Sequence, residues 1–216
     1  MNAVIFDMDG VIFDTERAWI ECWAPVGEKY AIKDIETVLR EQCVGITAAS
    51  MRANLLNTYG ADFPYEKYRD EASAIFRARY AHRLPMKIGV AALLDFLRGQ
   101  GAPVALASST GTRLVREELT DAGIVQYFDV ITGGEEVARS KPAPDIFLLA
   151  AQRLKKEPPA CFVVEDSYNG SRAAHAAGMR PIMVPDLLPP NAEMNELAEA
   201  VCPSLNEVID YLRGRL

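Results

Sequence analysis

Two aspartates stand two residues apart directly after an apolar run near the start of the chain. The stretch is AVIFDMDGVIFDTE, residues 3–16, and it places Asp7 and Asp9 just before Gly10. An extended backbone points residues i and i+2 to the same face, which sets these two carboxylates roughly 6 to 7 Å apart. Because carboxylates this close repel each other, either a cation lies between them, one of them holds a proton, or they form an ordinary polar turn at a strand end.

Polar groups of a complementary kind follow other apolar runs. Ser108 and Ser109 end the run PVALASS, Glu165 and Asp166 follow CFVV, and Lys141 lies in the loop RSKPAP. Carboxylates gathered near one point would bind a hard cation through oxygen, and Mg²⁺ with water and a substrate phosphate is the common case. A hydroxyl, backbone amides and a lysine would hold phosphate oxygens on the other side. The residue types therefore indicate phosphoryl chemistry, which needs strong charge neutralisation because phosphate monoesters hydrolyse extremely slowly unaided.

These groups can act together only if the ends of the apolar runs meet in the fold. The runs have the character of short buried strands, at residues 3–6, 103–109, 127–133, 161–167 and 180–185. Helical patterns lie between them, at residues 90–101, 112–123, 144–156 and 171–178. Apolar strands that alternate with helices predict an α/β fold, a Rossmann-like doubly wound parallel sheet. Such sheets bind ligands beyond the carboxyl ends of their strands, where the polar groups named above fall.

Residues 15–81 break this alternation, because helical patterns follow one another there without a strand-like run. Trp19 and Trp23 lie four residues apart in the first of these patterns, and we expect them in the core of this segment rather than in a ligand cage. The sequence thus predicts an α/β core domain built from residues 1–14 and 82–216. A small helical domain, residues 15–81, is inserted after the first strand.

Composition limits the class of protein. The chain has 216 residues, is 50% hydrophobic and carries a formal net charge of −7. This charge argues against a nucleic-acid partner, which requires clustered Lys and Arg, but it allows a small anionic substrate beside a local positive centre. No apolar run approaches the ~20 residues of a membrane span, so we expect no membrane association and a cytoplasmic location. We also expect a monomer.

Cysteine and histidine offer no second site of chemistry. The four cysteines form no CxxC pair, which predicts free, reduced thiols in ordinary buried positions. His82 and His175 have no partner at metal-ligand spacing, so we expect both to be structural.

Four short motifs of the chain resemble those of the haloacid dehalogenase superfamily of phosphatases and phosphomutases. They are DMDGVIFDTE, the serine of ALASS, the lysine of SKPAPDIF and the acidic pair of VVEDSYNG, in this order. Within the superfamily, the chain looks most like the branch that includes β-phosphoglucomutase and small sugar-phosphate phosphatases, and the likeness covers nearly its whole length. The resemblance implies that the inserted helices form a cap domain, which closes over the site and selects the substrate.

The resemblance also implies roles for the acids. Asp7 would be the nucleophile that takes up the phosphoryl group, and Asp9 would protonate the leaving oxygen and later deprotonate water. Mg²⁺ would be bound by the Asp7 carboxylate, the backbone carbonyl of Asp9 and the Asp166 carboxylate. Glu165 would be either a fourth ligand or a residue just behind the ligands.

The remaining motif residues would hold the phosphate. Ser108, the backbone amide of Ser109 and Lys141 are expected to contact the oxygens of the transferring group. The implied activity is Mg²⁺-dependent hydrolysis of a small-molecule phosphate ester, such as a sugar phosphate, through an aspartyl phosphate.

Two alternatives differ in what happens to the phosphoryl group. A β-phosphoglucomutase-type phosphomutase resembles this chain, but such enzymes carry an arginine in a G-x-[ST]-R pattern, where this chain has Gly45-Ile46-Thr47-Ala48. A histidine expected near the start of the cap is replaced by Trp19, and both departures favour a hydrolase. A non-enzymatic phosphoaspartate signalling switch would be near 120 residues and would lack the helical insertion.

Overall fold

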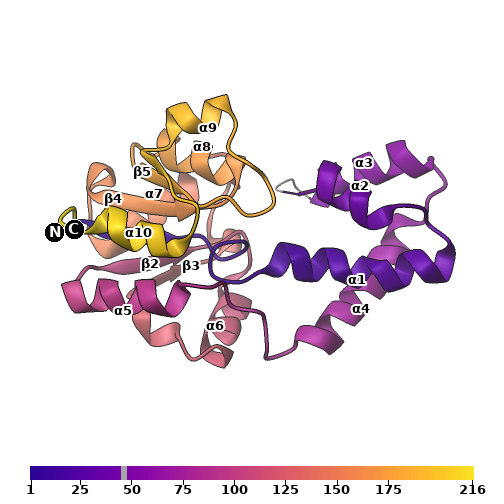
Figure 1. Cartoon of the computed structure of the whole chain (residues 1–216), viewed down its shortest axis with the longest axis horizontal. Coiled ribbons are helices and arrows are strands. Elements are labelled where there is room, and N and C mark those ends of the chain that lie inside the picture. The colour runs from indigo at the N-terminus through magenta and orange to yellow at the C-terminus, as the bar shows by residue number, and fades with distance from the viewer. Residues whose placement is uncertain (45–47) are drawn as a thin grey trace. The chain divides into compact units, whose positions relative to one another are not determined.

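A parallel sheet forms the centre of the α/β part of the molecule (Figure 1). The computed structural model describes residues 1–44 and 48–216, with the side chain of Ala48 excepted. Within the described residues the sheet has six strands in the order β3-β2-β1-β4-β5-β6, and each neighbouring pair is parallel. The strands are β1 (Ala3–Phe6), β2 (Val104–Ala107), β3 (Val130–Thr132), β4 (Cys161–Glu165), β5 (Arg180–Met183) and β6 (Ala200–Val201). The predicted doubly wound parallel sheet is confirmed, and only the two-residue β6 has no counterpart among the predicted strands.

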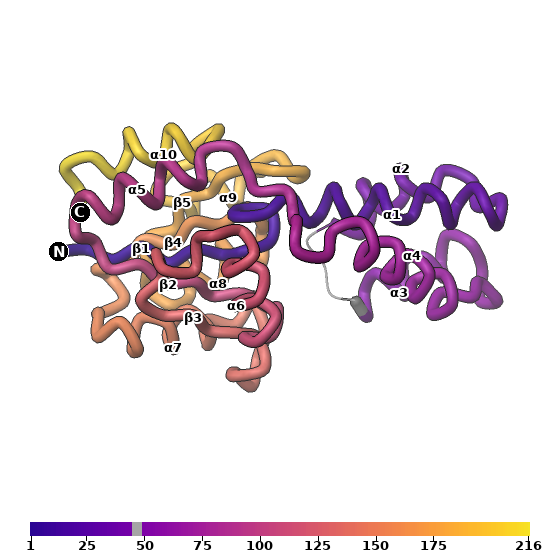
Figure 2. Tube along the Cα trace, turned by 90° about the horizontal axis from the view of Figure 1, so that it is seen from below, coloured from indigo at the N-terminus to yellow at the C-terminus, as the bar shows by residue number. Residues whose placement is uncertain are grey.

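Helices cover both faces of this sheet (Figure 2). The helices of the α/β part are α5 (Val90–Gln100), α6 (Thr112–Asp121), α7 (Asp145–Leu154), α8 (Tyr168–Ala176), α9 (Ala192–Leu197) and α10 (Leu205–Leu212), with short 3₁₀ turns at Val125–Tyr127, Gly134–Glu136 and Pro158–Ala160. Alternate strand residues such as Ile5 and Val163 form one buried cluster with Phe147 of α7 and Ala174 of α8. The residues between them point the other way, and Phe162 meets Tyr211 of α10 edge to face.

The first strands have the residues that a sheet buried on both faces requires. Every residue of β1, β2 and β4 is buried, in agreement with their uninterrupted apolar sequences. Fully burying one Val, Leu, Ile or Phe side chain stabilises a fold by about 1.5–3 kcal/mol. These strands therefore provide a rigid base for whatever side chains follow their carboxyl ends.

Between β1 and α5 the chain forms four helices in succession. They are α1 (Thr15–Tyr30), α2 (Ile35–Gln42), α3 (Ala48–Tyr59) and α4 (Tyr65–Tyr80). Trp23 is fully buried, and Trp19 lies edge to face against both Trp23 and Phe76 of α4. The tryptophan pair is thus part of the core of the helical segment, as its spacing predicts.

The chain divides into two compact units. One comprises Met1–Phe13 and Met86–Leu216, and the other comprises Asp14–Pro85. The sequence-derived boundaries at residues 15 and 81, and the assignment of the helical unit as a cap, remain predictions. The Gly45-Ile46-Thr47-Ala48 stretch lies outside the described residues, apart from the backbone of Ala48 at the start of α3.

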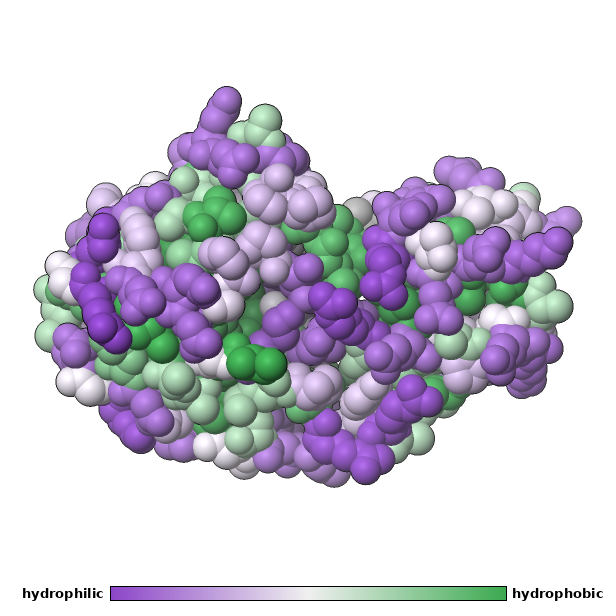
Figure 3. Space-filling model, in the orientation of Figure 1, coloured by the Kyte–Doolittle hydropathy of each residue, from purple (hydrophilic) through white to green (hydrophobic). Residues whose placement is uncertain are grey.

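The surface is largely polar. The face drawn in Figure 3 is mostly hydrophilic, with apolar residues in separate small areas. Large apolar side chains that are exposed among the described residues are few: Met1, Met86, Ile88, Leu114 and Leu148. None of the described helices has both the length and the apolar character needed to cross a membrane.

The four cysteines are buried and unbonded to one another. Burial raises the pKa of Cys43 and of Cys161 to about 11, so both thiols stay protonated at neutral pH. Because the thiolate is the reactive form, these two side chains are inert members of the interior.

Candidate active site

Three acids meet at the carboxyl ends of β1 and β4. Asp7 directly follows β1, Glu165 is the last residue of β4, and Asp166 follows it. The two strands pair in parallel register, and the Asp7 backbone N–H donates to the Val164 carbonyl at 3.0 Å. One carboxylate oxygen from each acid lies within 4.8 Å of the others, and all three residues are at most 9% exposed. Strand pairing therefore gathers these acids, as their position after two apolar runs predicts.

Lys141 joins two of these acids. Its Nζ donates to Asp7 Oδ1 at 2.7 Å and to Glu165 Oε1 at 2.7 Å. The lysine side chain is 9% exposed and lies over the ring of Phe147, with Nζ 4.8 Å from the ring centroid. Since the ammonium is buried between two carboxylates, it is a fixed element of the site rather than a solvated loop charge.

The second oxygen of Glu165 is held from the other side. Glu165 Oε2 accepts hydrogen bonds from the backbone N–H and the hydroxyl of Ser167, both at 2.9 Å. Ser167 is also the N-cap of α8, where its Oγ accepts from the Gly170 N–H at 3.0 Å. Both oxygens of the fully buried Glu165 thus have protein partners, which favours a place behind the metal ligands over direct coordination.

Asp9 lies in a tight loop after β1. The Met8 carbonyl accepts from the backbone N–H groups of Ile12 and Phe13, at 2.8 and 3.1 Å, and the Gly10 N–H donates to the Phe13 carbonyl at 2.8 Å. Gly10 has φ of +78°, a conformation that glycine adopts without strain. The hydroxyl of Thr110, from the loop after β2, donates to Asp9 Oδ2 at 3.2 Å. Thr110 directly follows the run PVALASS, and nothing in its position along the chain indicates a contact with Asp9.

The serines of the second motif occupy different environments. Ser108 is fully buried, and its Oγ accepts from the Thr110 backbone N–H at 3.0 Å. Ser109 is exposed, and its carbonyl lies so close to Gly134 that a Cβ there would be 2.3 Å away. The loop after β2 therefore holds Ser108 inward and packs closely against the loop after β3.

Burial and crowding determine the charge state of the nucleophile candidate. Burial raises the pKa of Asp7 to about 7, Lys141 opposes this rise, and repulsion from Glu165 and Asp9 adds to it. The two carboxylates in turn hold the pKa of Lys141 above its ordinary value in spite of its burial, so this side chain stays charged. A second positive charge near Asp7 would lower the pKa of Asp7 again and keep the carboxylate ionised.

The residues fit a divalent cation. Oxygen donors from Asp7, Asp166 and Glu165 converge at one point, and hard cations prefer such ligands. A Cβ added to Gly10 would lie 2.1 Å from Asp166 Oδ2, so the loop backbone after Asp9 passes directly against this carboxylate. The negative charge of these acids exceeds the positive charge of Lys141, which also favours a cation at this point.

Glu118 of α6 interacts electrostatically with Asp9, and the sequence motifs do not include it. Burial, followed by repulsion from Asp9, raises the pKa of Glu118 to about 7. Its Oε2 is buried and has no hydrogen-bond partner among the described residues. Its position in the helix could have indicated partial burial, because it lies three residues after buried Val115 and next to buried Leu119.

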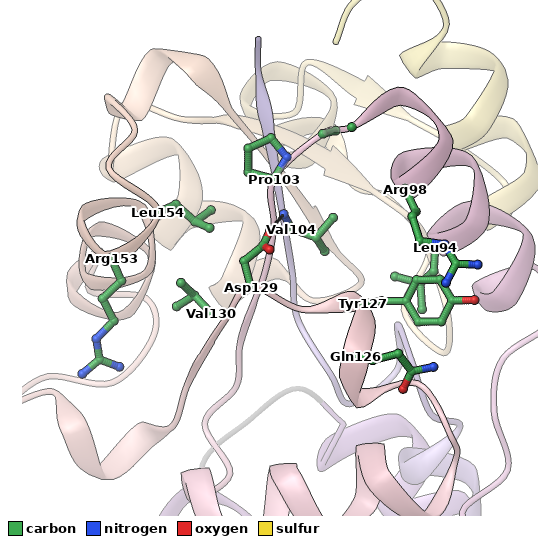
Figure 4. A pocket seen from close by; sticks show the side chains of 12 residues that line it. Leu94, Arg98, Pro103, Val104, Gln126, Tyr127, Asp129, Val130, Arg153 and Leu154 are labelled. Atoms are coloured by element: carbon green, nitrogen blue, oxygen red, sulfur yellow. Dashed lines mark hydrogen bonds between the residues drawn. The ribbon is translucent and has the colours of Figure 1, made fainter.

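A hollow of about 510 Å³ lies away from the acids, at the amino ends of β2 and β3 (Figure 4). Its polar walls are already paired. Asp129 accepts from the Val104 N–H at 2.9 Å, and the Arg98 guanidinium lies over the Tyr127 ring, 4.4 Å from its centroid. Arg153, on the opposite side, binds Glu136 at 2.6 Å. This hollow shares no residue with the candidate active site.

Comparison with known proteins agrees with this geometry. The chain matches the haloacid dehalogenase-like hydrolase family over residues 4–184. A phosphorylated carbohydrates phosphatase of Thermotoga maritima is 33% identical over 182 residues, which cover 84% of this chain and 84% of that protein. The β-phosphoglucomutase of Bacillus subtilis is 32% identical over 189 residues, which cover 83% of this chain and 81% of that protein. The structure of a haloacid dehalogenase family hydrolase of Deinococcus radiodurans, with bound phosphate and sodium, superposes with a TM-score of 0.84 at 28% identity and covers 99% of this chain and 96% of that one.

The chain therefore belongs to the haloacid dehalogenase-like hydrolase family. The predicted resemblance and fold are confirmed, and so is the prediction of a hydrolytic enzyme with phosphatases among its relatives. Its relatives include proteins named for action on phosphorylated carbohydrates, both a phosphatase and a mutase. The non-enzymatic signalling switch is set aside.

Proposed function

We propose that the protein is a Mg²⁺-dependent phosphatase that hydrolyses a small organic phosphate monoester, in particular a sugar phosphate. The observation that carries the proposal is the Asp7 carboxylate, which is bound to Lys141 at 2.7 Å and grouped with Glu165 and Asp166 within 4.8 Å. A carboxylate beside a fixed cation and a metal site is suited to attack phosphorus, because the charge of the phosphoryl oxygens is neutralised nearby. Relatives named for phosphorylated carbohydrates support the choice of substrate class.

In the first half-reaction an oxygen of Asp7 forms a bond to phosphorus, and the bond from phosphorus to the ester oxygen breaks. Asp9 gives its proton to this departing oxygen, so the product leaves as a neutral alcohol. In the second half-reaction Asp9 takes a proton from water as the water oxygen bonds to phosphorus. The bond to Asp7 then breaks, and inorganic phosphate is released.

Thr110 orients Asp9 for both steps, because its hydroxyl donates to Asp9 Oδ2 at 3.2 Å. Lys141 and Ser108 contact the oxygens of the transferring group, together with the backbone N–H of Ser109. Glu165 holds Lys141 in place through its bond of 2.7 Å. Each group is fixed before substrate arrives, so little reorganisation is needed during the reaction.

Asp7, Asp166 and the backbone carbonyl of Asp9 hold the metal ion in this proposal, with Glu165 behind them. When bound, Mg²⁺ supplies positive charge to the phosphoryl oxygens and to the Asp7 carboxylate. The proposal is supported by the convergence of the Asp7 and Asp166 carboxylates and by the close passage of the Gly10 backbone past Asp166.

The test is turnover of a panel of phosphate esters, with Asp7→Asn as the central variant. The amide keeps the shape of the side chain but cannot attack phosphorus, so activity should fall by about 10⁴-fold or more. Asp210→Asn, which changes a side chain 73% exposed in α10, is the matched control and should leave activity unchanged. Asp7→Asn activity within about tenfold of the wild-type rate would remove Asp7 from its proposed role.

Metal removal tests the cofactor. EDTA should abolish turnover, and Mg²⁺ should restore it. Ca²⁺ should inhibit, because calcium takes more ligands at longer distances and disturbs the alignment around Asp7. Full activity of the EDTA-treated protein would contradict a metal-dependent mechanism.

A phosphomutase is the second candidate. The β-phosphoglucomutase of Bacillus subtilis supports it, with 32% identity to this chain. We favour hydrolysis because a mutase must hold a second phosphate, and Trp19 and Ala48 stand where cationic groups would be expected.

The helical segment, residues 15–81, is proposed to be the cap that selects between hydrolysis and transfer. A monomeric state and a cytoplasmic location remain predictions.

A further inference from the structure

Lys87 is fixed to the loop that carries Asp9. The Lys87 backbone N–H donates to the Ile12 carbonyl at 2.8 Å, and Met86 pairs with Phe13 in an antiparallel bridge. Phe13 itself is bridged to Asp9. Residues 86 and 87 therefore extend the backbone hydrogen bonding of this loop.

The side chain of Lys87 reaches a different part of the sheet. Its Nζ binds Asp186 Oδ1 at 2.6 Å, with the Asp186 side chain 2% exposed and the Lys87 side chain 21% exposed. Asp186 lies just after β5, and the Val184 backbone N–H donates to the Glu165 carbonyl at 2.7 Å. The ammonium therefore binds the segment that directly continues the strand beside Glu165.

The order of the strands shows where this pair lies relative to the acids. β4 lies between β1 and β5, and its end carries Glu165 and Asp166. Lys87 touches the loop after β1 with its backbone and the loop after β5 with its ammonium. The Lys87–Asp186 pair thus links the two loops that flank the acidic end of β4.

We propose that the Lys87–Asp186 pair is a positioning element of the active site, which fixes the Asp9 loop relative to Asp166 and so sets the geometry of the cation site. The inference rests on the proposed function. An exposed ion pair contributes little, but the Asp186 side chain is nearly fully buried, so removing the ammonium takes a charge-assisted contact from a buried carboxylate. The loop after β5 then shifts or takes up water, and residue 87, although it keeps its backbone bond to Ile12, no longer ties the Asp9 loop to the loop after β5.

The experiment compares Lys87→Met, Asp186→Asn and the wild-type chain at a temperature where all are folded. Calorimetry with Mg²⁺ alone measures cation binding, and steady-state kinetics measures kcat and KM. Groups that orient metal ligands typically affect metal affinity or activity by 10–100-fold, so both variants should bind Mg²⁺ about tenfold more weakly and lose about tenfold in kcat. KM should change by less than about twofold, because neither side chain contacts substrate.

A double variant, Lys87→Met with Asp186→Leu, separates positioning from stability. It removes both charges of the pair, so thermal stability should return toward the wild-type value while Mg²⁺ affinity stays weak. Lys87→Arg keeps the charge and should retain most of the affinity. Arg98→Met, which breaks an exposed pair with Asp95, is the control for loss of an ordinary ion pair and should change neither quantity.

Two results would overturn the proposal. One is Mg²⁺ affinity and kcat of both single variants within about twofold of wild type although their thermal stability has fallen, which is the result of a purely structural pair. The other is recovery of Mg²⁺ affinity in the double variant together with stability. A wild-type chain that binds Mg²⁺ but hydrolyses no phosphate ester contradicts the proposed function and leaves the calorimetric test of the pair intact. A wild-type chain that binds no Mg²⁺ contradicts both.

Discussion

Lys141 is the cation on which the buried acids depend. It binds Asp7 and Glu165 at 2.7 Å each, and all three side chains are at most 11% exposed. Breaking a buried pair by removing one partner typically costs 3–5 kcal/mol, because the remaining charge is unpaired. We expect Lys141→Met to lower the free energy of unfolding by about 3 kcal/mol at pH 8 and to abolish turnover.

The cost of Lys141→Met should depend on pH in a defined direction. Without the lysine the folded-state pKa of Asp7 rises further, since burial and repulsion from Glu165 and Asp9 are no longer opposed. A carboxyl whose folded pKa lies above the unfolded value destabilises at high pH and not at low pH. Urea denaturation should therefore show a smaller loss of stability at pH 5 than at pH 8. An equal loss at both values would mean that packing, not charge, dominates.

Glu118 gives an independent residue-scale prediction. Burial and then Asp9 raise its pKa to about 7, from a model-peptide value of 4.5. Its carboxylate therefore costs stability above pH 7, and the cost disappears as pH falls below about 4.5, where both states are protonated. Glu118→Gln should stabilise the protein at pH 8 and have no effect near pH 4. Greater stabilisation at pH 4 than at pH 8 would contradict the assigned direction.

The motif residues could be predicted from the sequence, and their partners could not. Asp7 and Asp166 stand out because acids at the end of an apolar run are unusual, and Lys141 stands out because it belongs to one of the four motifs. Glu118 and the Lys87–Asp186 pair are ordinary charged residues in the sequence, and only the packing of distant segments gives them their surroundings. Long-range pairing of this kind leaves no local pattern, so residue types and spacing cannot reveal it.

At the scale of the element, α8 passes very close to the side chain of Glu165 at the end of β4. Gly170 lies in this helix and is buried, and a Cβ there would be 1.6 Å from Glu165 Oε1. Helix propensity alone predicts that Gly170→Ala stabilises the helix by up to about 1 kcal/mol. The close approach predicts the reverse, a loss of about 1–3 kcal/mol by overpacking and a fall in activity as Glu165 moves away from Lys141.

Gly99→Ala is the matched control for Gly170→Ala. Gly99 lies in α5, and a Cβ there has no atom of another residue within 4 Å. Thermal melts should show Gly99→Ala to be neutral or stabilising, by up to about 1 kcal/mol. If Gly170→Ala stabilises as much as Gly99→Ala, the helix does not depend on close approach to Glu165.

Element types were predictable where one pattern dominated. β1 and β4 are found at the runs AVIF and CFVVE, because a strand buried on both faces is apolar throughout. The predicted run at residues 127–133 is shortened, since Val125–Tyr127 forms a 3₁₀ turn and β3 begins only at Val130. The two-residue β6 was missed because so short a strand depends on its neighbour β5 rather than on its own sequence.

At the scale of the whole molecule, the net negative charge of the chain would repel an anionic substrate. The formal net charge is −7, and a phosphate ester, the proposed substrate, would have to reach a site lined with acids. Lys141 is buried and paired, so it cannot attract substrate from a distance. A bound cation would reverse the local field, which makes metal loading a condition for substrate binding as well as for chemistry.

The proposed phosphoenzyme could pass its phosphoryl group either to water, as in a phosphatase, or to a second sugar hydroxyl, as in a mutase. A mutase needs a cationic contact for the second phosphate of its bisphosphate intermediate, and this chain has Trp19 and Ala48 at the positions in question. A hydrogen bond to a charged group contributes about 1.5–3 kcal/mol, so the loss of one weakens the intermediate about tenfold to a few hundredfold. With Mg²⁺, β-glucose 1-phosphate and a glucose bisphosphate activator, inorganic phosphate should therefore appear faster than glucose 6-phosphate. Accumulation of glucose 6-phosphate with negligible phosphate release would show that the chain is a mutase, and that another residue of the helical unit, such as Arg17 or Arg52, supplies the missing charge.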